Sequence, residues 1–324
     1  MNDLVSDNIK KIIIFLFLLI PFVSGEIENY NQYSDLIISY TFNTEIEILD
    51  FGALDYFIAN LTLVPLQTYR QSILNMNIHP SPNSQIVRES DHITSTWEQY
   101  NEELRLEIFS EIRTNNTLHK LNHIDFPIQH LDEEYKYYLQ ESEKIDINQE
   151  IVDKATEIVS GETDLYTAVF KIADWTRDNI EYDLNSLTSK AVLESSWVLE
   201  HKQGVCDEIT SLFISLLRSV GVPARFVSGS AYTNLDYSFG NHGWAEVYFP
   251  DYGWVPYDIT FGEFGWLNPA HLSLSKTLDS SNSAILYTWL GSNVEIDTSP
   301  INIEADVSNI GGSIEEIFDI RIET

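Results

Sequence analysis

The hydrophobic pattern of this chain changes near residue 150, from a period of two to a period of three to four. Before that point apolar and polar residues alternate in several runs, most clearly at 38–42, 74–78 and 104–108. Alternation puts every second side chain on one face, so each run predicts a strand with one buried face. Several such strands separated by polar turns are typical of a β-sandwich.

A polar connection at 116–149 leads into the part of the chain with helical spacing. Apolar residues then recur every three or four positions, and the third such stretch has the apolar stripe of a helix with one buried side. The three helical stretches contain Leu165, Val169 and Ile172; Ala191, Val192, Trp197 and Leu199; and the run from Cys206 to Val220, which Gly221 and Pro223 end. Strand patterns follow at 224–231, 243–249 and 254–259. Helices followed by strands predict an α+β domain.

The end of the chain returns to alternation. Ile301 and Ile303 precede a turn at 309–312, and another alternating run follows at 318–322. Because two strands alone are marginally stable in water, they either dock on the preceding domain or begin a β-sandwich that is cut short. The pattern does not choose between these alternatives.

The balance of charge excludes one broad class of partner. The chain of 324 residues has 18 Lys and Arg against 50 Asp and Glu, a formal net charge of -32. Such a surface repels phosphate backbones, so we expect no nucleic-acid partner. The hydrophobic fraction of 44% is ample for ordinary cores, and the length suggests two or three domains.

The first 25 residues have the order of a secretory signal peptide. Lys10 and Lys11 precede an apolar run at 12–23, and Ser24 and Gly25 follow. The run is shorter than the roughly 20 residues that cross a bilayer. We therefore expect a cleaved signal peptide and a secreted or cell-surface protein. The alternative is an uncleaved N-terminal anchor, which would be the protein's contact with a membrane.

The single cysteine, Cys206, lies where a helix begins. An exported chain with one cysteine forms no internal disulfide. Gly204 allows the backbone to turn sharply, and a thiol in the first helical turn lies near unpaired N–H groups and the positive end of the helix dipole. Both favour the nucleophilic thiolate, although Asp207 and Glu208 oppose it. A lone cysteine is more often a buried structural residue, so the neighbouring motifs decide its role.

A histidine and an aspartate further along the chain complete a candidate site. His242 opens a strand pattern, and Asp258 follows 16 residues later in the next strand pattern. The turn at 251–253 would pair the two strands antiparallel and bring Asp258 back towards His242. An imidazole could accept the thiol proton while a carboxylate fixes its tautomer. The structural alternative for His242 is an ordinary histidine at a strand end.

Three segments together resemble the transglutaminase-like superfamily, whose members share a papain-like core. They are Gly204-Val205-Cys206 with the helix and Gly221-Val222-Pro223-Ala224-Arg225 after it, His242-Gly243-Trp244-Ala245-Glu246-Val247, and Gly253-Trp254-Val255-Pro256-Tyr257-Asp258. The order and the intervals also fit, over about a third of the chain. The resemblance implies a papain-like catalytic core. Together with the alternating patterns it predicts an α+β fold, with an N-terminal β-sandwich-like domain before the core and a short C-terminal β segment after it.

The predicted division of the chain follows from these patterns. It consists of a signal peptide at 1–25, a β-sandwich-like domain at 26–140, a catalytic domain at 141–293 and a C-terminal β segment at 294–324.

The resemblance also implies roles for individual residues. Cys206 would be the nucleophile, His242 the general base and later acid, and Asp258 the orienting carboxylate, with a thioester as intermediate. The backbone N–H of Cys206 would be one oxyanion donor, with Tyr182 or alternatively Gln203 as a second. Aromatic residues expected in the core or along the substrate cleft are Trp197, Trp244 and Trp254. We expect no cofactor and no required metal.

The thioester permits two outcomes. Attack by water makes the protein a protease, peptidase or amidase, and attack by an amine makes it a crosslinking transglutaminase. We favour hydrolysis of a protein or peptide substrate, such as an amide of the cell envelope. A non-catalytic surface binding or scaffold module is the competing class.

Overall fold

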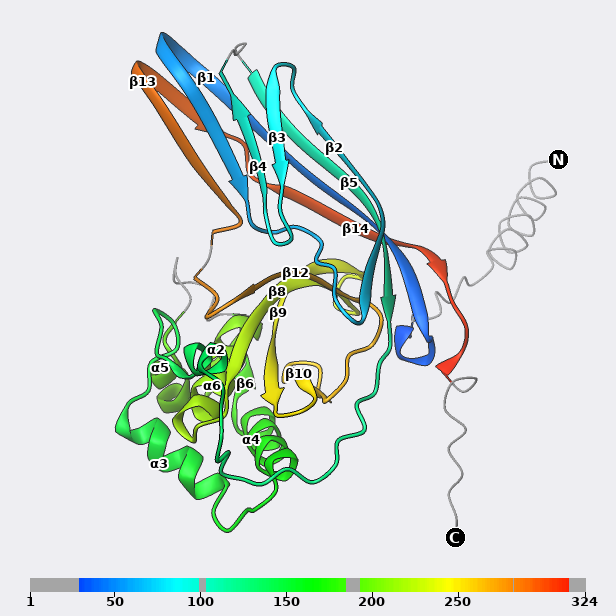
Figure 1. Cartoon of the computed structure of the whole chain (residues 1–324), viewed down its shortest axis with the longest axis vertical. Coiled ribbons are helices and arrows are strands. Elements are labelled where there is room, and N and C mark those ends of the chain that lie inside the picture. The colour runs from blue at the N-terminus through cyan, green and yellow to red at the C-terminus, as the bar shows by residue number, and fades with distance from the viewer. Residues whose placement is uncertain (1–28, 99–102, 185–192, 282, 315–324) are drawn as a thin grey trace, which may run out of the picture.

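The computed structural model describes residues 29–98, 103–184, 193–281 and 283–314 (Figure 1). The expected signal peptide at 1–25, the helical positions Ala191 and Val192, and the alternating run at 318–322 lie outside these residues. The described part consists of a large β-sheet region and a mixed region of helices and strands, as the sequence predicts. No helix of the described part is both long and apolar enough to cross a membrane.

The large sheet is built around one very long strand, β1 (Asp35–Leu61). Its strands run in the order β2-β5-β1-β4-β3, and β13 and β14 also pair with β1. The bounds of the partners are β2 (Gln71–Pro80), β3 (Ser84–Arg88), β4 (Ile93–Trp97), β5 (Glu103–Asn115), β13 (Ile285–Thr298) and β14 (Asn302–Ile310). A 3-10 turn, η1 (Tyr30–Gln32), precedes β1. The predicted runs at 38–42, 74–78 and 104–108 therefore fall within β1, β2 and β5.

The sheet folds over so that the two halves of β1 face each other. Thr44 Oγ1, in the first half, lies 2.8 Å from the hydroxyl of Tyr287, and Tyr287 pairs with Ala59 in the second half. In β5 the odd positions are mostly exposed and Leu104, Leu106, Ile108 and Ile112 are buried, which is the alternation that the sequence predicts. The predicted β-sandwich-like fold is confirmed.

The C-terminal strands return to this first sheet. The chain from β13 to β14 runs antiparallel to β1 along nearly its whole length, from Leu61 paired with Ile285 to Leu36 paired with Ile310. This pairing covers backbone groups of β1 that would otherwise be an open edge. The expectation that the tail docks on the preceding domain or starts a new sandwich is thus replaced by a third arrangement. The predicted division at 293/294 falls inside β13.

The mixed region places helices against a curved five-stranded sheet of order β11-β10-β9-β8-β12. Two short helical turns, α2 (Glu133–Lys136) and η2 (Tyr137–Leu139), lie in the connection from the large sheet. The helices are α3 (Gln149–Ile158), α4 (Leu165–Asn179), α5 (Ser195–His201) and α6 (Cys206–Ser219). The strands are β8 (Ala224–Thr233), β9 (Ser238–Phe249), β10 (Gly253–Asp258), β11 (Glu263–Phe264) and β12 (His271–Thr277). A separate parallel pair joins β6 (Glu181–Tyr182) to β7 (Gln203–Gly204).

The helix α6 lies at the centre of this region and is buried on all sides. Buried residues extend continuously from Glu208 to Arg218, because α3, α4 and α5 pack on the helix together with β8 and β9. The sequence predicts a helix with one buried side, and the structure shows instead that α6 is buried all round. Two of its buried hydroxyl groups find acceptors outside the helix: Thr210 donates to the carbonyl of Gly243, and Ser215 donates to the carbonyl of Asp146.

A buried arginine joins the two regions. Arg70, in the link between β1 and β2, is 3% exposed and donates to the carbonyls of Leu267, Asn268 and His271 at 3.3, 2.9 and 3.4 Å. Gln71 adds two hydrogen bonds of 2.8 Å to the backbone of Ser273. Burial lowers the pKa of the Arg70 guanidinium. The first sheet therefore holds the segment 267–273, which leads into β12.

We expect Arg70→Met to lower the free energy of unfolding by about 1–3 kcal/mol, because buried carbonyls lose their donor. Arg88→Met, at an exposed position of β3, is the matched control and should change the free energy by less than about 0.5 kcal/mol. Urea unfolding of both variants measures the difference. Equal, small effects would show that Arg70 does not hold the two regions together.

Candidate active site

The thiol of Cys206 stands at the first position of α6. Val205 is the N-cap, and its backbone N–H donates to Glu208 Oε2 at 2.8 Å, which fixes the first turn. Gly204 has no room for a side chain, because a Cβ there would lie 2.8 Å from Glu208 Cβ. Cys206 is half-buried and free of any disulfide. The thiol therefore lies in the first turn of α6, as the sequence predicts.

His242 and Asp258 come from neighbouring antiparallel strands. In the register of β9 and β10, Tyr257 pairs with Ala245, so Asp258 lies just beyond the last pair and diagonal to His242. His242 Nε2 lies 2.6 Å from Asp258 Oδ2, and both residues are buried. The predicted turn at 251–253 makes this register, with Asp251 and Gly253 both at positive φ.

The electrostatics of the pair favour a charged imidazole. Burial by itself lowers the pKa of His242, but the charge and hydrogen bond of Asp258, together with hydrogen bonding and charge from Cys206, raise that pKa to about 10. Burial raises the pKa of Asp258, and the opposing contacts with His242 and His271 bring it below its usual range. Since Nε2 is used by Asp258, Nδ1 is the ring nitrogen left for the sulfur. The arrangement therefore supports a charged imidazole beside the cysteine.

The carboxylate of Asp207 is a third polar group beside the thiol. Cys206 Sγ donates to Asp207 Oδ1 at 3.6 Å. A Cβ on Gly243 would lie 2.6 Å from that oxygen, so the glycine after His242 leaves space for the carboxylate. Burial raises the pKa of Asp207, against the contacts with Cys206 and His242, which lower it. The sequence suggests that Asp207 disfavours the thiolate, and the structure places its carboxylate in direct contact with the sulfur of Cys206.

A second imidazole contacts the same aspartate. His271, at the start of β12, is fully buried and places Nε2 3.0 Å from Asp258 Oδ2. His242, Asp258 and His271 are the group in the described residues whose ligand atoms lie within 4.8 Å of one another, the spacing a metal ion would need. The distances of 2.6 and 3.0 Å are those of charge-assisted N–H···O hydrogen bonds. We therefore treat the three residues as a hydrogen-bonded network.

Cys206 and His242 open onto a cleft of about 460 Å³. Its wall also holds Tyr182, placed beside the cysteine because β6 pairs with β7, where Tyr182 lies opposite Gly204. Arg177, in the last turn of α4, gives the wall a cation in a strongly acidic protein. The remaining lining residues are Ile180, Ile209, Ala231, Thr233, Leu235, Gly240, Asn241, Ile259, Thr260 and Phe261.

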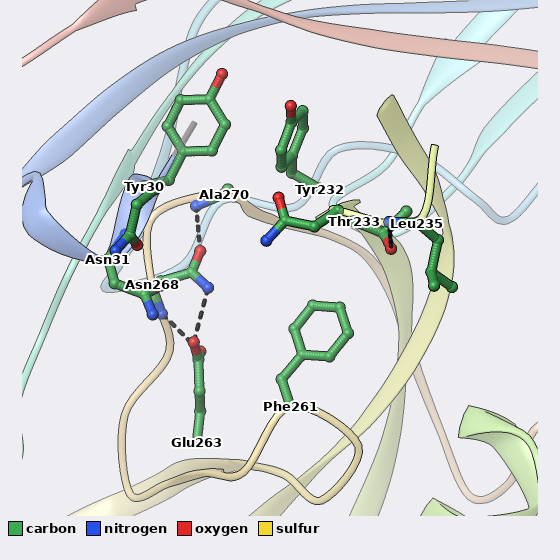
Figure 2. A pocket seen from close by; sticks show the side chains of 11 residues that line it. Tyr30, Asn31, Tyr232, Thr233, Leu235, Phe261, Glu263, Asn268 and Ala270 are labelled. Atoms are coloured by element: carbon green, nitrogen blue, oxygen red, sulfur yellow. Dashed lines mark hydrogen bonds between the residues drawn. The ribbon is translucent and has the colours of Figure 1, made fainter. Parts of the chain in front are cut away.

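A second cavity, of about 400 Å³, is lined by the residues drawn in Figure 2 and shares part of its lining with this cleft. The two share Thr233, Leu235 and Phe261, so these side chains divide one from the other. The lining of the second cavity is mostly amide and aromatic. On its floor Asn268 donates to Glu263, by its backbone N–H at 2.8 Å and its side chain at 2.7 Å.

The structure brings together Cys206, His242 and Asp258, and it places Tyr182 on the same cleft. Gln203 is half-buried in β7 and is not part of the cleft wall. The three tryptophans predicted for the core or the cleft also lie off that wall. Trp197 stacks on His201 at 4.1 Å, Trp244 is fully buried beneath the histidines, and Trp254 packs with Arg225 4.0 Å from its ring. Their large apolar surfaces are used in packing.

Sequence reasoning missed His271 and Phe261. His271 begins an alternating strand pattern, but its contact with Asp258 depends on the curvature of the sheet, since β9 and β8 separate β10 from β12. The ring of Phe261 stacks on His242 at 4.6 Å, and its backbone N–H donates to Asp258 Oδ1 at 2.9 Å. Phe261 lies three residues after Asp258, and this spacing indicates a turn in which a backbone N–H can donate to the carboxylate.

The raised pKa of His242 predicts a pH dependence of stability. A group whose pKa is raised by folding contributes stability in full below its ordinary pKa, and the contribution is lost as the pH rises through the folded value. For His242 that window runs from 6.5 to about 10. We expect the difference in free energy of unfolding between the wild type and His242→Gln to shrink across this window. Urea unfolding at a series of pH values measures it, and a constant difference would contradict the charged pair.

Comparison with known proteins gives the site a family context. The model of the transglutaminase-like superfamily matches residues 152–259. The uncharacterized protein YebA of Bacillus subtilis is 40% identical over 100 residues, which are 26% of this chain and 13% of YebA. The uncharacterized protein ML0607 of Mycobacterium leprae is 31% identical over 101 residues, 29% of this chain and 34% of that protein. The match thus spans well under two thirds of either relative.

A crystal structure with a similar fold covers both regions of the chain. A proposed cysteine protease from Cytophaga hutchinsonii superposes with a TM-score of 0.61 at 18% identity, over 86% of this chain and 92% of that one. At this identity the likeness concerns the fold, and it includes the large sheet as well as the mixed region.

Proposed function

Because residues 152–259 form a domain of the transglutaminase-like superfamily, we propose that this protein is a thiol-dependent hydrolase of peptide or other amide bonds. The observation that carries the proposal is the placement of Cys206 and His242 on one open cleft, with Asp258 2.6 Å behind the imidazole. A buried ion pair of this kind carries a desolvation cost, and titratable groups with strongly shifted pKa values cluster at functional sites.

The proposed reaction has two halves. The Cys206 thiolate attacks the carbonyl carbon of the amide, the C–N bond breaks, and imidazolium His242 gives its proton to the leaving amine. A thioester with Cys206 remains. Water then attacks the thioester, His242 takes the proton of the water, and the C–S bond breaks. The acid product leaves, and the thiolate and imidazolium are restored.

Asp258 keeps its charge throughout this cycle. Its low pKa and its buried hydrogen bond hold the Nε2–H tautomer of His242, so Nδ1 always faces the cleft. The stacked ring of Phe261 limits rotation of the imidazole. The chain's own residues therefore supply the nucleophile, the proton carrier and the orientation.

Tyr182 is the proposed side-chain donor to the oxyanion, beside the backbone N–H of Cys206. Burial, followed by the negative charges of Cys206, Asp207 and Glu208, raises the pKa of its hydroxyl, so the group stays protonated and able to donate. We expect Tyr182→Phe, which removes only the hydroxyl, to lower kcat about 100- to 1000-fold. Gln203→Ala, away from the cleft wall, is the control and should leave kcat near the wild-type value. Steady-state kinetics separate the two, and a Tyr182→Phe enzyme of normal kcat would remove the tyrosine from the mechanism.

The proposal also includes the localisation of the protein and the class of its substrate. The signal-like order of residues 1–25 supports export to the cell surface or the medium, where proteins and amide-containing envelope polymers are available substrates. The net charge of -32 argues against a nucleic-acid partner.

Dimethylated casein offered together with a biotinylated alkylamine tests the reaction type. Hydrolysis predicts new casein fragments without biotin, dependent on Cys206. Biotin on glutamine side chains would instead assign the protein to crosslinking. If neither product forms and Cys206 alkylates no faster than free cysteine, the non-catalytic binding class replaces the proposal.

A further inference from the structure

The carboxylate of Asp258 is held by three donors from three different parts of the fold. Its Oδ2 accepts from His242 Nε2 at 2.6 Å and from His271 Nε2 at 3.0 Å, and its Oδ1 accepts from the backbone N–H of Phe261 at 2.9 Å. A planar carboxylate bound at both oxygens cannot rotate about its side-chain bonds. The contact with His271 is the one of the three that does not come from β9 or from the turn after β10.

His271 uses one ring nitrogen for this contact. Nε2 faces the carboxylate, so it carries the proton and donates. Nδ1 makes no hydrogen bond with any described residue, and Glu263 Oε2 lies 3.9 Å away. Position 271 therefore needs one N–H donor at the place of Nε2. Another side chain that puts a donor there should make the same hydrogen bond to Asp258.

The surroundings fix the place of that donor. The ring of His271 meets Trp244 edge-on at 5.4 Å and Phe261 at 5.5 Å. Just before it, Asn268 Oδ1 accepts from the backbone N–H of Ala270 at 2.8 Å, within the network on the floor of the second cavity (Figure 2). Arg70 of the first sheet region holds the carbonyls of Asn268 and His271 itself. The large sheet thus supports the backbone that carries His271.

We propose that His271 is a positioning residue of the active site, which keeps the Asp258 carboxylate aimed at His242 and so maintains the reactive state of Cys206. The proposal rests on the proposed function, because it assumes that Cys206 is the nucleophile. His271 is not on the cleft wall, and its hydrogen bond within the site is the one to Asp258.

The test measures the reactivity of Cys206 and needs no substrate. The readout is the rate of alkylation of the full chain by iodoacetamide at about pH 6.5, where an ordinary thiol is about 1% ionised. The variants are His271→Gln, whose amide nitrogen reaches the place of Nε2, His271→Asn, whose amide does not, and His271→Leu. Thermal unfolding checks that each variant is folded.

We expect His271→Asn and His271→Leu to alkylate about 10- to 100-fold more slowly than the wild type, since a small misplacement of a reacting group can cost that much. His271→Gln should retain most of the wild-type rate. In an Asp258→Asn background, His271→Leu should add little, because the partner through which it acts has already changed. Comparison of His271→Gln with His271→Asn tests the need for a donor even if His271→Leu does not fold.

Three results would overturn the inference. A folded His271→Asn or His271→Leu variant that reacts at the wild-type rate would show that no orientation depends on His271. A folded His271→Gln variant as slow as His271→Asn would show that the donor is not what matters. A wild-type thiol no faster than free cysteine would remove the proposed function, and the inference with it.

Discussion

Replacing Cys206 with alanine is expected to lower amide hydrolysis by a factor on the order of 10⁶, as removal of the nucleophile does in other triads. The side chain forms the covalent intermediate, and no described residue on the cleft wall offers another thiol. Release of fragments from dimethylated casein measures the loss. The fold should survive, because Cys206 is only half-buried and alanine suits a helix.

Ser211→Ala is the matched control for this substitution. Ser211 lies on the same helix, is fully buried and has no hydrogen-bond partner for its hydroxyl among the described residues. The Ser211→Ala substitution also removes one heteroatom, and we expect the variant protein to keep its activity. A Cys206→Ala protein that still hydrolyses casein, when Ser211→Ala does so too, would show that the reaction occurs elsewhere.

Asp258→Asn is expected to lower kcat about 10⁴-fold with little change in the shape of the site. The amide has the size of the carboxyl group but loses its negative charge, and its nitrogen can face a histidine that also needs to donate. His242 would then adopt the other tautomer or rotate away from the sulfur. The effect should appear in kcat more than in KM, since Asp258 is fully buried and does not touch the substrate.

Asp251→Asn is the control for this second variant. Asp251 is an exposed residue of the turn before β10 at a φ of 68°, a conformation that asparagine tolerates well. It removes the same charge from the same hairpin and should keep full activity. Comparable losses in both variants would indicate an effect of net charge on the domain rather than of Asp258 on His242.

The residues of the triad could be proposed because each lies in a local pattern and the three segments together resemble one superfamily. A glycine and a cysteine open an amphipathic helix, and a histidine and an aspartate lie on two strands joined by a tight turn. The tight turn permits a hairpin register that brings Asp258 towards His242, so this contact could be expected without knowledge of distant contacts. The same local logic predicted β1, β2 and β5.

The features that were not predicted depend on long-range packing. His271 reaches Asp258 because the five-stranded sheet curves, and β13 joins β1 across more than 220 intervening residues, as Leu61 pairing with Ile285 shows. No pattern near either strand encodes that pairing. The tryptophans illustrate the same limit, because an aromatic residue in a helix or a strand suits a core and a cleft equally. Which of the two it occupies depends on the layers that cover it.

The large sheet has a structural link to the chemistry that the sequence did not suggest. Arg70 and Gln71 hold the segment that begins β12, and β12 carries His271. Variants of the link between β1 and β2 should therefore affect both stability and the reactivity of Cys206. If His271 has the proposed positioning role, the first region supports the active site through these backbone contacts and without touching substrate.

Mass spectrometry of the acyl-enzyme tests the central claim most directly. The protein is mixed briefly with casein peptides, quenched in acid to preserve a thioester, and digested. We predict one acyl group on the peptide that contains Cys206, formed by the wild type and by Ser211→Ala but absent from His242→Ala. Substrate turnover with Cys206 unmodified, or acylation that does not depend on His242, would contradict the account.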